Sequence, residues 1–336
     1  YIYNMESPFS KVILFIVFVL GNCHLHAQVL VKDSSVLPTA DAKLIKKEKA
    51  LHFIAMGDWG RNGADHQREV AKQMGITANE IGSQFTIATG DNFYPSGVIS
   101  EWDPLWKYSF EDIYTDFRLQ WDWYPVLGNH DYKSNPDAQV KYSTISRRWK
   151  MPARYYSKTF SINGDTTQQV LLVFIDTNPF IDSYHSKGEQ MEENVKTQDT
   201  IAQKKWLIET LNTNDKSIKW KIVIGHHPMY SGGKRKNSKD TKNMEDKFAS
   251  LFDQYKVDAY LCGHEHDLQV IKPKNRYTTQ FLSGAGCEVR PTGNREGTLF
   301  AVSEPGFMTF SVTETKMLVQ LVNAFGKIVY TTELTK

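Results

Sequence analysis

The chain of 336 residues is long enough for one large domain or two smaller ones, and its 40% hydrophobic and 23% charged residues are an ordinary globular composition. Its 40 basic and 38 acidic residues leave a net charge of +2. This balance excludes a strong overall field for nucleic acid or an anionic membrane, so any anion-binding site must be local.

The first predicted segment is a secretory signal peptide at residues 1–27. Lys11 precedes nine apolar residues at 12–20, and Ala27 is the small residue expected before cleavage. Nine apolar residues are too few to span a bilayer, which needs about 20. We therefore expect a secreted or periplasmic protein without a membrane span. Lipid attachment at Cys23 is less favoured, because Asn22 is a poor residue before such a cysteine.

The residues after the signal peptide divide into a short lead-in and one domain. Residues 28–49 mix polar and lysine-rich stretches and predict a flexible lead-in. Residues 50–336 are expected to form a single domain. It contains Cys262 and Cys287, both in apolar surroundings, which favours two buried thiols over a disulfide.

Buried strands alternate with helices in the first part of this domain. Apolar runs of strand length predict strands at 51–56, 85–89, 124–127, 170–175, 221–224 and 259–262. Helical periodicity is found at 65–81, 104–117 and 202–211. After Ile271 only strands are expected, at 278–284, 306–312, 316–322 and 327–334. The alternation predicts an α/β domain with largely buried sheets, completed by a meander.

Five strand ends share one pattern, in which glycine precedes a residue that can bind a metal ion. The stretches are MGDWG, TGDNFY, LGNHD, IGHHP and CGHEH. Each alone is equally well explained by a turn, but ligands of α/β sheets bind at the carboxyl ends of strands. All five together predict that these side chains meet: Asp58, Asp91, Asn129, His226, His264 and His266.

This mixture of donors suits two different cations. Two metal ions about 3.5–4 Å apart can hold an attacking oxygen and a phosphoryl oxygen, and a carboxylate can bridge them. Imidazole and amide suit a divalent transition metal, whereas hard oxygen donors suit a trivalent ion. Tyr94 follows Asp91 by three residues. A phenol with an ordinary pKa of about 10 becomes a ligand only beside a strongly polarising cation, which favours ferric iron.

The motif set GDWG, GDNFY, GNHD, GHxP and GHEH resembles the purple acid phosphatases of the calcineurin-like metallophosphoesterase superfamily, specifically the small tartrate-resistant type. The resemblance covers nearly all of the chain after the predicted signal peptide. Tyr94 separates the purple phosphatases from most other members of the superfamily. The resemblance implies two mixed β-sheets packed as a sandwich flanked by helices, the four-layer αββα arrangement.

The resemblance also implies a role for each candidate residue. Asp91 would bridge the two metals, while Fe(III) would be bound by Asp58, Tyr94 and His266. A divalent Fe, Zn or Mn would be held by Asn129, His226 and His264. His130 would contact the substrate or assist the leaving group, and Asp131 would accept a hydrogen bond that orients His130.

The activity implied is that of a secreted acid phosphatase, in which metal-bound hydroxide attacks a phosphate monoester. A phosphodiesterase or nucleotide hydrolase that uses the same dinuclear site is the main alternative. A non-catalytic binding protein is disfavoured, because such a protein should have lost ligands and every expected position is present here. The sequence gives no indication of oligomeric state and no evident nucleic-acid-binding surface.

Some segments depart from the family pattern or have no assigned role. Mammalian members carry a further active-site histidine beyond GHxP, whereas no histidine follows His227 in this segment. The basic run 234–236 is either a clamp for an anionic substrate or, more commonly for such runs, a solvated loop. The polar loop 180–200 resembles a loop that covers the site in relatives, and the cysteines of the mammalian disulfide have no counterparts here.

Overall fold

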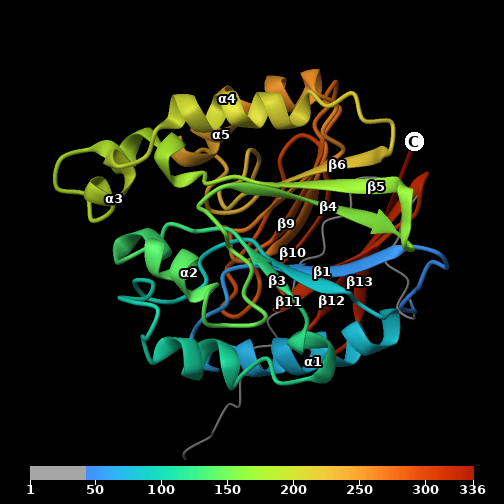
Figure 1. Cartoon of the computed structure of the whole chain (residues 1–336), viewed down its shortest axis with the longest axis horizontal. Coiled ribbons are helices and arrows are strands. Elements are labelled where there is room, and N and C mark those ends of the chain that lie inside the picture. Colours follow the sequence, from blue (N-terminus) through green and yellow to red (C-terminus); the bar gives the residue numbers. More distant parts are fainter. Residues whose placement is uncertain (1–42) are drawn as a thin grey trace, which may run out of the picture.

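The computed structural model describes residues 43–336, so the predicted signal peptide and most of the predicted lead-in lie outside the described residues. Two β-sheets pack face to face in the middle of the molecule, and helices cover both outer faces (Figure 1). Helix α1 lies on one side, whereas α4 and α5 lie on the other. The predicted α/β sandwich with flanking helices is confirmed.

The first sheet has six strands in the order β13-β12-β11-β1-β2-β3. Its three parallel strands come from the first part of the chain, and the remaining three form an antiparallel meander. The bounds are β1 (Leu51–Met56), β2 (Phe85–Ala88), β3 (Trp123–Pro125), β11 (Gly306–Val312), β12 (Lys316–Asn323) and β13 (Ile328–Thr335).

The second sheet has seven strands in the order β10-β8-β9-β7-β6-β5-β4. Strands β5, β6, β7 and β9 are parallel neighbours, and antiparallel strands close both edges. The bounds are β4 (Tyr156–Ile162), β5 (Asp165–Phe174), β6 (Ile218–Ile224), β7 (Ala259–Cys262), β8 (Leu268–Ile271), β9 (Thr279–Ser283) and β10 (Thr298–Val302).

The main core lies between the two sheets. Phe85 on β2 stacks on Phe160 of β4 with ring centroids 4.2 Å apart, and Phe281 on β9 meets Phe310 of β11 edge to face. Strand β1 is buried along its whole length, because it lies inside its sheet and is covered on both faces. Burial on both sides explains its continuous apolar sequence.

The helices are placed by their caps and apolar faces. Gly82 ends α1 in the left-handed conformation, and the Asp199 carboxylate accepts backbone N–H groups at the start of α4. The bounds are α1 (Gln67–Ile81), α2 (Asp137–Tyr142), α3 (Glu192–Lys196), α4 (Thr200–Leu211) and α5 (Lys239–Gln254). Short helical turns occur at Trp106–Glu111, Phe117–Gln120, Asp131–Lys133, Asn178–Phe180 and Asp182–His185.

The element predictions are wrong at one helix and miss several further elements. The helix expected at 104–117 is reduced to the turn Trp106–Glu111, where Trp106 stacks on Tyr142 and Phe110 packs against Trp149. Tertiary aromatic packing outweighs helical periodicity there. Strands β4, β8 and β10 were not expected, and neither were α2, α3 and α5, although the buried Met244, Phe248 and Phe252 of α5 recur every four residues.

Three smaller findings concern the start of the domain, its cysteines and its helices. In the described end of the lead-in, the Ile45 N–H donates to the Gln320 side chain and Lys47 pairs with Glu333 at 2.7 Å. Cys262 and Cys287 are both buried and free, as the sequence favours. Among the helices of residues 43–336, none combines the length and apolar character needed to cross a bilayer.

Candidate metal centre

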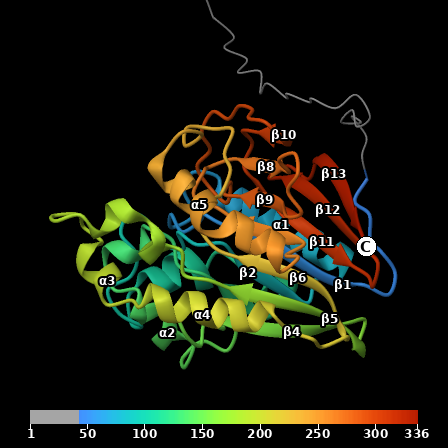
Figure 2. The same cartoon turned by 90° about the horizontal axis from the view of Figure 1, so that it is seen from above.

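The carboxyl ends of β1, β2, β3, β6 and β7 meet at one edge of the sandwich, and each continues into one of the five glycine motifs. Seen from above, β6 of one sheet overlies β1 and β2 of the other in projection (Figure 2). The glycines permit close approach of the strand ends. A Cβ on Gly128 would lie 2.2 Å from Oδ1 of Asp91, and one on Gly263 would lie 2.3 Å from Oδ2 of Asp58.

Three of the candidate ligands have left-handed backbone conformations that residues other than glycine rarely adopt. The φ angles are 58° for Asp58, 48° for Asp91 and 70° for His264. The turns are held by hydrogen bonds between motifs, since Asp58 N donates to Gly90 O and His264 N donates to Oδ2 of Asp58. Such strain is typical of functional sites, where the surrounding structure imposes it.

Three donor atoms surround the Tyr94 hydroxyl, and the four residues form what we call the tyrosine subsite: Asp58, Asp91, Tyr94 and His266. The phenol oxygen lies 3.2 Å from Oδ1 of Asp58, 3.1 Å from Oδ2 of Asp91 and 3.1 Å from Nε2 of His266. All four side chains are buried. The subsite offers three oxygens and one imidazole nitrogen.

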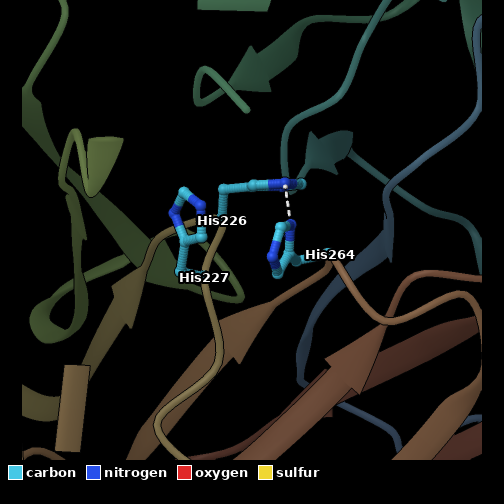
Figure 3. A group of neighbouring side chains, drawn as sticks. All are labelled: His226, His227 and His264. Carbon is cyan, nitrogen blue, oxygen red and sulfur yellow. Dashed lines mark hydrogen bonds between the residues drawn. The ribbon is translucent and has the colours of Figure 1, made fainter. Parts of the chain in front are cut away.

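A second group, the histidine subsite, consists of Asp91, Asn129, His226 and His264. Nε2 of His226 lies 3.2 Å from Oδ1 of Asn129, 3.1 Å from Nδ1 of His264 and 3.5 Å from Oδ1 of Asp91. Figure 3 shows the His226 and His264 rings turned toward one another, with His227 beside them. Asp91 belongs to both subsites through its two oxygens.

The spacing of these atoms fits bound metal ions. Two ligands each about 2.1 Å from a cation lie roughly 3.0 Å apart at a right angle and roughly 3.4 Å apart at a tetrahedral angle. The distances in both subsites fall between 3.1 and 3.5 Å. Asp58, Asp91 and His226 also form a group whose ligand atoms all lie within 4.8 Å of one another. The donor set can hold two cations.

Burial controls the charges in this cluster. It raises the pKa of Asp58 to about 8, with a further contribution from Asp91. Burial also lowers the pKa of His266 to about 3 and that of His264 well below its ordinary value. For Asp91, burial is outweighed by His226, which holds the carboxyl pKa well below its ordinary range. Although burial opposes it, Asp91 raises the pKa of His226 to about 9, so this ring must give up a proton before it can bind a cation, whereas His264 and His266 are already neutral.

His130 lies at the border of the tyrosine subsite. Its backbone N–H donates to Oδ1 of Asp91 at 2.7 Å, its Nε2 lies 4.0 Å from Oδ2 of Asp91, and its side chain is 24% exposed. Nδ1 lies 2.6 Å from the carbonyl oxygen of Pro95. A carbonyl can only accept, so Nδ1 carries the hydrogen and Nε2 of the neutral ring faces the site with its lone pair.

Asp131 does not orient His130, so that expectation is corrected. The buried carboxylate instead accepts backbone N–H groups from Asn92 at 3.0 Å, Phe93 at 3.2 Å and Gly128 at 2.8 Å. These bonds tie the GDNFY loop to the GNHD loop. The Pro95 carbonyl takes the place that the sequence assigned to Asp131.

Comparison with known proteins identifies the family. Residues 51–268 match the calcineurin-like phosphoesterase family. The chain is 33% identical over 302 residues to purple acid phosphatase 7 of Arabidopsis thaliana, covering 87% of this chain and 88% of the relative. It is 32% identical to human tartrate-resistant acid phosphatase type 5, covering 85% of this chain and 91% of the relative. The chain belongs to the purple acid phosphatases.

Solved structures agree on the fold. GAP50, described as the anchor in the inner membrane complex of Plasmodium, superposes with a TM-score of 0.72 at 24% identity over 86% of this chain and 89% of that one. A dimetal phosphatase from Danio rerio superposes with a TM-score of 0.57 at 12% identity over 86% of this chain and 99% of that one. As a purple acid phosphatase the chain is a phosphoric monoester hydrolase with a dinuclear metal site.

His227 of this purple acid phosphatase is buried beside the histidine subsite, where His226, His227 and His264 each offer a nitrogen and these nitrogens lie within 4.8 Å of one another. Its Nδ1 lies 2.8 Å from Oγ1 of Thr177 and its Nε2 lies 2.9 Å from the hydroxyl of Tyr184. Both ring nitrogens therefore have partners. Tyr184 belongs to the polar loop 180–200, so its hydroxyl attaches that loop to His227 beside the histidine subsite.

The same loop is also attached at its two ends. Asp182 pairs with Asn243 and Lys247 on α5, and the Asn194 side chain donates to the carbonyls of Tyr132 and Ser134 at 2.7 Å. Tyr132 and Ser134 directly follow the GNHD motif. The loop thus connects α5 with the loop that carries His130.

The basic run 234–236 does not form a three-residue clamp. Lys234 and Lys236 are exposed, and Lys236 donates to the carbonyl of Asn294. Only Arg235 turns inward, where its Nη1 lies 3.7 Å from Oε1 of the buried Glu265. Sequence reasoning also missed Arg61 and Glu288, which border the tyrosine subsite; only the position of Arg61 directly after GDWG pointed to it.

Proposed function

We propose that this purple acid phosphatase is an exported acid phosphatase that hydrolyses phosphate monoesters at an Fe(III)–M(II) centre, with M a divalent Fe, Zn or Mn. The tyrosine subsite would hold the ferric ion and the histidine subsite the divalent ion, with Asp91 between them. One observation carries the proposal most directly. The hydroxyl of Tyr94 lies within 3.2 Å of three other donors, two of them carboxylates.

A hard trivalent cation suits the tyrosine subsite better than the histidine subsite. Burial, Asp58 and Asp91 all raise the pKa of Tyr94 well above its ordinary value, so the phenol gives up its proton only to a strong positive charge. The histidine subsite supplies two imidazoles and an amide, which suit a divalent transition metal. When bound, the two cations supply the Lewis acidity that activates water and neutralises the phosphoryl oxygens.

The protein side chains hold the loops of the site in place and supply a proton. Asp91 and the backbone bonds to Asp131 fix the two metal-bearing loops relative to one another. His130 presents Nε2 to the site while the carbonyl of Pro95 holds Nδ1. In its protonated form His130 would carry the second proton at Nε2 and donate it to the leaving alkoxide. The chain needs no covalent nucleophile for this reaction.

A comparison of two substrates tests the proposed specificity. We expect the purified enzyme to hydrolyse p-nitrophenyl phosphate at acidic pH with a higher kcat/KM than bis(p-nitrophenyl) phosphate. A preference for the diester would favour the phosphodiesterase alternative, which uses the same dinuclear site.

Export is tested separately, by sequencing the N-terminus of the mature protein. A mature chain that begins at Gln28 is the expected result.

A further inference from the structure

Two side chains outside the predicted ligand set, Arg61 and Glu288, form an ion pair against the tyrosine subsite. Nη2 of Arg61 lies 2.6 Å from Oε2 of Glu288, and we call the two residues the outer pair. Arg61 is 24% exposed and Glu288 39%, so the pair is partly shielded from water. The two residues are 227 positions apart, and each also faces one candidate ligand.

Glu288 faces the second nitrogen of His266. Oε2 of Glu288 lies 3.8 Å from Nδ1 of His266, which is buried and has no hydrogen-bond partner. Nε2 of the same ring is turned to Tyr94 and Asp58. A ring that offers the Nε2 lone pair to a cation must carry its hydrogen on Nδ1, and a carboxylate is a suitable acceptor. The separation is about 1 Å longer than a hydrogen bond, so the bond forms when the carboxylate moves by that distance.

Neighbouring backbone contacts keep Glu288 in this position. Arg290 N donates to the carbonyl of His266 at 2.8 Å, and Nε of Arg290 lies 3.8 Å from Oε1 of Glu288. The Cys287 thiol approaches the carbonyl oxygen of Asp58 at 2.7 Å. The segment that carries Glu288 is therefore fixed to the two motifs that carry Asp58 and His266.

Arg61 faces the ring of Tyr94. Its guanidinium carbon lies 4.2 Å from the ring centroid, which is a cation–π distance. Arg61 follows GDWG directly, so it is placed by the same turn as Asp58. The guanidinium over the ring face fixes the orientation of the ring and thereby the position of its hydroxyl. The charge is itself held in place by Glu288.

We propose that Arg61 and Glu288 act together as positioning residues of the tyrosine subsite. Glu288 holds His266 with its hydrogen on Nδ1, and Arg61 holds the ring of Tyr94 in place through the cation–π contact. This inference rests on the proposed function, because it presupposes that Tyr94 and His266 bind a metal ion. It concerns the strength and electronic character of metal binding rather than any contact with substrate.

Metal loss from the Zn(II)-loaded enzyme tests the role of Glu288. The full-length enzyme is stripped, reloaded with Zn(II) and exposed to EDTA, and Zn(II) release is followed over time. We expect Glu288→Gln to lose Zn(II) from one of its two sites about 10–100-fold faster than the wild type, the usual effect of removing such an outer partner. Glu288→Asp should recover part of the retention.

Glu314→Gln is the matched control. Glu314 pairs with Lys219 at 3.1 Å, and Val312 before it aligns with Leu51 at the start of β1, so this pair lies at the opposite end of the sheet from the site. The Glu314→Gln variant should release Zn(II) at the wild-type rate. Equal release from Glu288→Gln, Glu314→Gln and the wild type would overturn the proposal. A wild type that binds no Zn(II) would instead contradict the metal centre itself.

A spectroscopic readout tests Arg61. In the iron-loaded enzyme, Arg61→Gln should shift the maximum of the phenolate-to-iron absorption band, whereas Arg61→Lys should shift it less because the charge is kept. The double variant Arg61→Gln, Glu288→Gln should release metal more slowly than the product of the two single effects predicts, since the two residues form one unit. An unmoved band in Arg61→Gln, with the band present in the wild type, would contradict the role of Arg61.

Discussion

Asp91 and Tyr94 lie three residues apart in the sequence and bring Oδ2 and the phenol oxygen to within 3.1 Å of each other, while Oδ1 of Asp91 lies 3.5 Å from Nε2 of His226. One carboxylate thus faces both groups of donor atoms. The left-handed backbone of Asp91 and the backbone N–H of His130 hold it in this orientation. A bridging ligand needs this two-sided geometry.

Replacing Asp91 should remove metal binding and activity together. We expect Asp91→Asn to lower metal affinity by more than about 100-fold, the upper range for the loss of an outer partner, because an inner ligand contributes more. The measurement is metal content together with kcat/KM. Asp112→Asn, which alters an exposed ion pair with Lys107, is the control and should behave as the wild type. A fully active Asp91→Asn enzyme would refute the bridging role.

Removing the hydroxyl of Tyr94 should abolish visible colour with little change in fold. In Tyr94→Phe the ring can still pack against His130 and Arg61, which lie 4.5 Å and 4.2 Å from it. The phenolate ligand, however, is gone, so the long-wavelength absorption of an iron-loaded enzyme should disappear. Absorption spectra and thermal midpoints of both proteins check this. A variant with the wild-type band would show that the colour has another source.

His130 should affect the chemical step and leave metal binding intact. We expect His130→Asn to keep both metal ions and to lower kcat by about 10²-fold or more for a substrate with a poor leaving group, since proton transfer contributes roughly 10²–10⁴-fold. For p-nitrophenyl phosphate, whose leaving group needs no proton, the loss should be much smaller. Equal losses on an alkyl phosphate and on p-nitrophenyl phosphate would argue against proton donation.

His52 should make the fold sensitive to acid. Burial, with a contribution from Lys46, lowers the pKa of this histidine on β1, whose Nδ1 contacts Oγ of Ser311 at 2.8 Å. Below about pH 6.5, the ordinary value for histidine, the unfolded chain binds a proton that the folded chain binds less readily, so stability falls as the pH falls. Above that pH, His52 contributes no pH dependence to the stability of the fold.

We expect the thermal midpoint of His52→Gln to fall less between pH 7.5 and pH 5 than the thermal midpoint of the wild type. The control is His185→Gln, because His185 lies on the surface loop 180–200 and is exposed. His52 is far in sequence from every candidate ligand except Asp58, and its side chain contacts β11 rather than the site. An equal drop in all three proteins would show that His52 does not cause the acid sensitivity.

Local patterns predicted an α/β domain with buried sheets and the meeting of six side chains, whereas the sandwich and the ligand role of Tyr94 were implied by the family resemblance. Apolar runs define the inner strands, and a glycine before Asp58, Asp91, Asn129, His226 or His264 indicates where each of these strands ends. Parallel neighbours then bring those ends to one edge. Strand β4, at the edge of its sheet, lacks a continuous apolar run, because several of its side chains are exposed.

Contacts between distant side chains could not be predicted in this way. Nothing in the sequence indicates that Asp131 binds backbone N–H groups rather than the ring of His130, or that His227 lies between Thr177 and Tyr184. Arg61 and Glu288 meet only because the first strand and the turn after β9 lie at the same edge. Such contacts depend on side-chain packing, which has no short-range sequence pattern.

The position of the metal ions tests the central claim most directly. Anomalous diffraction from crystals of the purified enzyme, recorded on both sides of the iron edge and of the zinc edge, locates each ion and identifies its element. We expect two ions about 3.5–4 Å apart on either side of Asp91, with iron next to Tyr94. A single ion, or two ions bound away from Asp91, would contradict the account.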